Sequence, residues 1–161
     1  MQDLAIKLRC SQFVAHACHN KVKGPMFLEY HEYLGELYGI YEGLYDDVVE
    51  RMIGLGIDAD PSALTKAAAD KAEEAEVYDG DALGMFSYLN DCEKEIRSLA
   101  EGLNEGATFG SKNFLQGIAD ESEKRSYKLG QILKNDSGSS SPKAYSAPIL
   151  RMVKPSRIIG A

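Results

Sequence analysis

Apolar side chains recur every three or four residues over four long stretches of the chain, which is the spacing of one face of an α-helix. Glycine, proline or polar clusters separate these stretches, and no alternating pattern of convincing strand length appears. The pattern therefore predicts an all-α protein. Its four long helices are expected at about residues 2–19, 26–55, 81–103 and 112–134.

A shorter helix is predicted in the long connection between the second and third helices. The segment DPSALTKAAADK begins there with Asp60 and Pro61, which are favoured at the N-cap and at the first helical position. Four long helices with one crossover describe a four-helix bundle, which we place at residues 1–135. NDSGSSSP has linker composition and predicts a separate C-terminal tail over 136–161.

Composition is that of a soluble globular protein, with 161 residues, 44% of them hydrophobic and 27% charged. No apolar run approaches the roughly 20 residues that span a bilayer, and the N-terminus lacks the apolar core of a signal peptide. We therefore expect a cytoplasmic protein without a membrane partner. The odd number of cysteines, without tight spacing, predicts reduced and packed thiols at Cys10, Cys18 and Cys92.

Charge is unevenly distributed along the chain, whose net charge is −7. Beyond Asp136 there are four basic and no acidic residues, so the rest of the chain holds 14 basic and 25 acidic residues, a net charge of −11. An acidic body with a basic tail results. Such a body repels nucleic acid and attracts cations.

The second predicted helix contains three glycines spaced by four, in HEYLGELYGIYEGLYDDVVER. Each of Gly35, Gly39 and Gly43 costs the helix roughly 0.5–1 kcal/mol relative to alanine. At 100° per residue the glycines share one face, and the apolar residues that would meet the core lie on another. The glycine face also carries a histidine and three carboxylates: His31, Glu42, Asp46 and Glu50.

His31 and Asp46 lie roughly 22 Å apart along this helix, too far to bind one ion within one chain. An antiparallel copy crossing near residues 38–40 would bring His31 level with the partner's Asp46 and Glu50, and glycines would let the two backbones approach closely. Imidazole and carboxylate ligands together suit iron or another first-row metal. Periodicity leaves two alternatives open: a loose, solvated surface, or glycines that accommodate neighbours in their own subunit.

The residues around these positions carry a more specific pattern. His19 and His31 stand 12 residues apart and flank a turn with Gly24 and Phe27. An acidic and basic element follows near the helix end, made of Asp46, Glu50 and Arg51. The pattern resembles the Dps family (DNA-binding proteins from starved cells), whose fold is ferritin-like. It extends without gaps from about His19 to Gly56.

The resemblance implies a ferritin-like bundle that assembles into hollow homododecamers. It implies ferroxidase sites at two-fold interfaces, where two histidines of one subunit and two acids of its neighbour act as metal ligands and catalytic residues. Such sites oxidise Fe(II) with hydrogen peroxide, or with oxygen, and the shell stores ferric mineral and so protects DNA from oxidative damage. The matching positions here are His19, His31, Asp46 and Glu50.

Two positions depart from the family pattern. Asn20 replaces the usual tryptophan, and Gly35 replaces an aspartate ligand found in many members. The four remaining ligands would hold one iron firmly and a second only weakly. Glu32, Glu36 and Glu42 are the alternative carboxylate donors.

The basic tail leaves a further choice open. Its positive charges, multiplied by oligomer symmetry, would favour DNA phosphates. Its apolar residues favour docking onto its own shell or onto another protein. The alternative function is accordingly a structural protein that keeps the ferritin-like fold and joins a larger assembly. The apolar residues of the tail are Ile149, Leu150, Met152, Val153 and Ile158.

Overall fold

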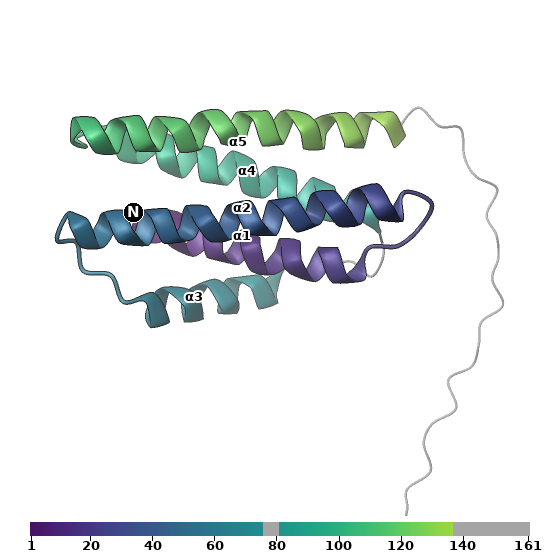
Figure 1. Ribbon diagram of the computed structural model, residues 1–161, viewed down its shortest axis with the longest axis horizontal. Helices are drawn as coiled ribbons and strands as arrows, with labels where there is room; N and C mark the ends of the chain where they lie inside the picture. Colours follow the sequence, from purple (N-terminus) through teal and green to yellow (C-terminus); the bar gives the residue numbers. More distant parts are fainter. Residues whose placement is uncertain (76–80, 137–161) are drawn as a thin grey trace, which may run out of the picture.

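The computed structural model describes residues 1–75 and 81–136, and all secondary structure in these ranges is α-helical. Four long helices run alongside one another, and a short helix lies against the outside of this bundle (Figure 1). The predicted all-α bundle with a helix in its crossover is therefore confirmed. The elements are α1 (Gln2–Lys21), α2 (Phe27–Gly54), α3 (Pro61–Glu74), α4 (Ala82–Asn104) and α5 (Phe109–Asp136).

The helices pack mainly as two pairs, α1 with α2 and α4 with α5, while α3 packs on α1. The core lies between the pairs and contains side chains from all four long helices. Burial of each large apolar side chain there contributes about 1.5–3 kcal/mol. On α2 the core face is the one predicted from its periodicity, with Leu34, Leu37, Tyr41, Tyr45, Val48 and Met52 buried.

Side-chain caps set the starts of α3 and α5. The Asp60 carboxylate accepts hydrogen bonds from the Ser62 and Ala63 amides at 2.9 and 3.3 Å, which confirms the predicted start of α3. The sequence predicts the start of the last long helix at about residue 112, but α5 begins at Phe109. The reason is a local cap, since the Thr108 hydroxyl accepts from the Ser111 amide at 3.3 Å.

The three cysteines are free and buried, as predicted. Burial raises the pKa of the Cys10 thiol to about 11 and that of Cys18 to about 12, so both stay protonated at neutral pH. In the described part of the chain, no helix combines the length and apolar content needed to cross a bilayer. The tail predicted for 136–161 lies, beyond Asp136, outside the described residues.

Candidate functional site

The two histidines singled out by the sequence lie against each other where α1 ends and α2 begins. The imidazole rings of His19 and His31 stack with their centroids 3.7 Å apart and an interplanar angle of 24°. Phe27 stacks on His31 at 5.0 Å, and Tyr38 meets the His19 ring edge-on at 5.4 Å. The turn between the helices thus brings together residues that are distant along the chain.

Reciprocal hydrogen bonds place a proton on Nδ1 of each ring. The Nδ1–H of His19 donates to the carbonyl of His31 at 2.8 Å, and the Nδ1–H of His31 donates to the carbonyl of His19 at 2.9 Å. Because a carbonyl oxygen only accepts, Nδ1 must carry a proton in each ring, and Nε2 of the neutral ring keeps its lone pair. Metal-binding histidines are typically oriented by bonds of this kind. The pair therefore offers two Nε2 donors.

The two predicted carboxylates lie elsewhere on the same subunit. Asp46 and Glu50 are exposed on α2, and neither has an ion-pair or hydrogen-bond partner among the described residues. Across those residues, no three His, Cys, Asp or Glu side chains converge on a position that could hold a metal ion. Within one subunit, His19 and His31 therefore lie in contact, whereas Asp46 and Glu50 lie away from them, as the helix geometry predicted.

The glycines of α2 do not share one environment. A Cβ atom built on Gly39 or Gly43 would meet no described atom within 4 Å, so neither glycine accommodates a neighbour from residues 1–75 or 81–136 of its own subunit. At Gly35, by contrast, a Cβ would lie 3.5 Å from Cε1 and Nδ1 of His19. Position 35 is consequently beside the histidine pair.

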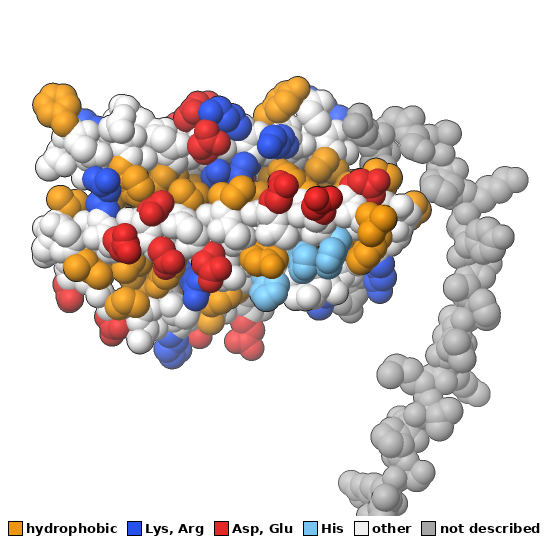
Figure 2. Space-filling view, viewed as in Figure 1, with side chains coloured by type: hydrophobic (Ala, Val, Ile, Leu, Met, Phe, Trp, Pro, Cys, Tyr) orange, Lys and Arg blue, Asp and Glu red, His pale blue; other side chains and the backbone are white. Residues whose placement is uncertain are grey.

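His16 is a further neighbour of this site that the sequence pattern did not single out. His16 is exposed on α1. The centroid of its ring lies 4.6 Å from that of Tyr38 and 6.3 Å from that of His19. All three histidines of the chain therefore gather on the face formed by α1 and α2, with acidic side chains spaced along α2 (Figure 2). The spacing of three between His16 and His19 places both on one side of α1 and was the available signal.

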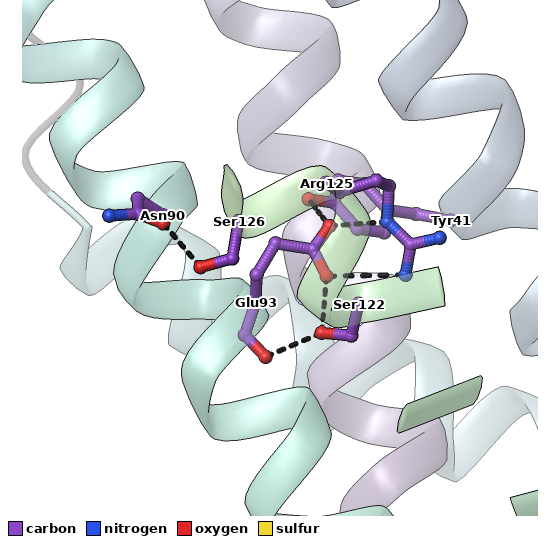
Figure 3. Close-up of polar contacts among 6 residues, drawn as sticks. All are labelled: Tyr41, Asn90, Glu93, Ser122, Arg125 and Ser126. Atoms are coloured by element: carbon purple, nitrogen blue, oxygen red, sulfur yellow. Dashed lines mark hydrogen bonds and ion pairs between the residues drawn. The ribbon is translucent and has the colours of Figure 1, made fainter. Parts of the chain in front are cut away.

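A second polar cluster, which the sequence did not reveal, lies inside the bundle (Figure 3). Glu93 on α4 is fully buried and forms a bidentate ion pair with Arg125 on α5, at 2.6 Å from Nε and 3.2 Å from Nη2. The hydroxyls of Tyr41 and Ser122 each donate to the same carboxylate at 2.6 Å. Burial and the Glu93 charge raise the pKa of the Tyr41 phenol well above its usual value.

This cluster makes the bundle interior unsuitable for iron. Ferritin-like di-iron proteins hold their metals inside the bundle with two glutamates and two Glu-x-x-His motifs. In this chain no histidine follows a glutamate by three residues. In the described ranges Glu93 is the single buried acid, and Arg125 already neutralises it. The described part of the bundle interior therefore lacks the ligand set of such a di-iron centre.

Comparison with known proteins agrees with this architecture. The sequence model of the ferritin-like domain matches residues 9–138, and the chain belongs to that family. Its fold is similar to the crystal structure of a DPS protein from Vibrio cholerae O1, described as a member of a broad superfamily of ferritin-like diiron-carboxylate proteins. The two share 21% identity over 82% of this chain and 85% of that chain, with a TM-score of 0.56. No curated protein sequence matches.

Proposed function

We propose that this chain is a Dps-like iron-sequestering ferroxidase that oxidises Fe(II) at sites shared by two subunits. His19 and His31 of one subunit and the partner's Asp46 and Glu50 bind the iron, and a hollow homododecamer stores the ferric product. The observation that carries this proposal is the reciprocal bonding of the two imidazoles. It commits each Nδ1 to a carbonyl and leaves two Nε2 atoms for the metal.

The donor set fits iron as a substrate. Imidazole nitrogens bind Fe(II) well, and two carboxylates favour the higher charge of Fe(III). Asp46 and Glu50 are four residues apart on α2, so they share one face of the helix. Because neither is paired with a described residue of its own subunit, binding iron breaks no salt bridge among those residues. A partner helix crossing at Gly39 would bury the glycine face and offset the helix penalty of about 0.5–1 kcal/mol per glycine.

Peroxide is the proposed oxidant, because its two-electron reduction at the site releases water and not hydroxyl radical. Removal of both Fe(II) and peroxide would protect DNA chemically. Direct DNA binding by the basic tail and docking of that tail on a protein surface stay predictions, since residues 137–161 lie outside the described ranges.

One observation favours the second candidate, a structural protein that keeps the ferritin-like fold and joins a larger assembly. Gly35 lies beside His19 and supplies no carboxylate, which lowers the affinity for a second iron. Iron turnover distinguishes the two candidates, because the structural protein needs none.

The experiment that tests the proposal is Gly39→Leu, compared with the parent protein by light scattering and stopped-flow Fe(II) oxidation. We expect the parent to oxidise Fe(II) with peroxide. The variant should lose both the large oligomer and the activity, because a leucine at the crossing separates the paired helices. Gly117→Leu is the matched control, since Gly117 is also exposed in a helix with nothing within 4 Å. A parent without peroxide-dependent oxidation contradicts the proposal. A Gly39→Leu protein whose oligomer size and activity are both unchanged contradicts a site shared between subunits.

Restoring a carboxylate beside His19 should strengthen the site. In Gly35→Asp the new Cβ makes an ordinary van der Waals contact with His19, so the side chain fits. We expect a second Fe(II) at each site in anaerobic titrations and faster oxidation by oxygen. Gly35→Asn, which has the same shape without the charge, should bind iron as the parent does. Equal gains in both variants would show that the carboxylate is not a ligand.

A further inference from the structure

A column of aromatic rings connects the histidine pair to Tyr38. Phe27 stacks on His31, His31 stacks on His19, and Tyr38 meets the edge of the His19 ring at 5.4 Å. Tyr38 also contacts His16, and the centroids of these two rings are 4.6 Å apart. We propose that Tyr38 is a one-electron donor to the reaction at the histidine pair, and this inference rests on the ferroxidase function proposed above.

Counting electrons gives the reason for such a donor. Reduction of one hydrogen peroxide to two waters takes two electrons, whereas one Fe(II) supplies one. In the proposed site Gly35, beside His19, supplies no carboxylate for a second iron, so a second electron donor near the site would complete the reduction. A phenol loses a proton and an electron together much more readily than an imidazole or a phenyl ring loses an electron. Tyr38 is the one phenol in the column.

The environment of Tyr38 suits this role better than that of its buried neighbours. In the single subunit Tyr38 is only partly buried, and no described residue hydrogen-bonds its hydroxyl, so no existing hydrogen bond holds its proton. Tyr41 is fully buried and its hydroxyl is committed to Glu93. The Tyr33 hydroxyl is buried without a partner, and burial raises the pKa of this phenol to about 12.

The proposed step balances. The O–O bond of peroxide breaks, Fe(II) becomes Fe(III), and the phenol of Tyr38 gives up its hydrogen atom. With one proton from solvent, the products are two waters, Fe(III) and a tyrosyl radical. A later Fe(II) reduces the radical, with uptake of one proton, to restore the phenol and yield a second Fe(III). Over the cycle two Fe(II) are oxidised per peroxide, and Tyr38 takes the place of a second bound iron.

The test uses the full chain in its assembled form, loaded with less than one Fe(II) per site and mixed with hydrogen peroxide. Freeze-quenched samples are read by electron paramagnetic resonance. We expect a tyrosyl radical in the parent and its loss in Tyr38→Phe, which keeps both ring contacts and removes only the hydroxyl. Spin-trapped hydroxyl radical should rise in that variant. Tyr33→Phe, on the same helix but packed on Phe86, should keep the signal.

The outcomes separate this inference from the function on which it rests. A parent that does not oxidise Fe(II) with peroxide overturns the ferroxidase function. Rapid oxidation without a tyrosyl radical, or a radical that persists in Tyr38→Phe, overturns only the role of Tyr38. Peptide mass spectrometry of the parent after turnover is independent of the variants. Oxidation products located at Tyr38 support the inference, and products confined to other tyrosines contradict it.

Discussion

Neither His31→Ala nor Asp46→Ala protein should oxidise Fe(II) by itself, and mixed assemblies of the two should regain activity. His31 provides an Nε2 donor to one half of the site, and Asp46 belongs to the half provided by the other subunit. An interface between the two variants holds one site with both defects and one intact site. Random mixing should therefore restore about a quarter of the parent activity, because half of the two-fold interfaces are mixed.

The measurement is the initial rate of Fe(II) oxidation after the variants are dissociated together and reassembled. Each variant reassembled alone is the control for the procedure. Asp47→Ala is the matched control for the carboxylate, since Asp47 is also exposed and unpaired in the described part of the chain. Failure of mixing to restore activity, while labelled subunits demonstrably exchange, would rule out a site shared between subunits.

The helices could be predicted from the sequence because apolar periodicity reports directly which face of each helix is buried. On α2 it separated the core residues Leu37 and Tyr41 from the exposed glycines Gly39 and Gly43. The start of α5 was missed because Thr108 caps the helix several residues before its first buried apolar side chain, Leu115. Periodicity is insensitive to a first turn that buries no apolar side chain, and here Phe109 is exposed.

The site could be predicted only in part. The spacing of His19 and His31, through the family resemblance, predicted two residues whose rings the structure stacks against each other, and helix geometry separated that pair from Asp46. The protonation of the two rings could not be predicted, because it depends on how closely two helix ends approach in space. Tyr38 was overlooked for the same reason, since its contact with His19 joins two helices.

The sequence does contain a signal for the ion pair inside the bundle, although apolar periodicity alone does not reveal it. Glu93 stands at a core position, between the buried Leu89 and Ile96, and Arg125 follows Ile118 by seven residues on the core face of α5. A charged residue at a core position needs a buried partner. The sequence does not say which of 18 basic residues that partner is. The packing of α4 on α5 decides it.

Arg125→Met should destabilise the fold by about 3–5 kcal/mol, because it leaves the fully buried Glu93 carboxylate without its counter-ion. Adding Glu93→Gln should recover much of this loss. The glutamine carbonyl can still accept from the Tyr41 and Ser122 hydroxyls, and no buried charge remains. Chemical denaturation at a fixed protein concentration gives the free energy of unfolding for each protein.

Arg97→Met is the matched control for this last prediction. Arg97 forms its ion pairs with Glu101 and Glu123 at 3.7 and 3.8 Å on the surface, so its loss should cost less than about 1 kcal/mol. Equal effects of Arg125→Met and Arg97→Met would show that Glu93 is not charged in the folded protein. Because Glu93 and Arg125 face the core, folded Arg125→Met protein should still oxidise Fe(II). Retained activity at reduced stability would separate the residues that hold the bundle together from those on α1 and α2 that bind iron.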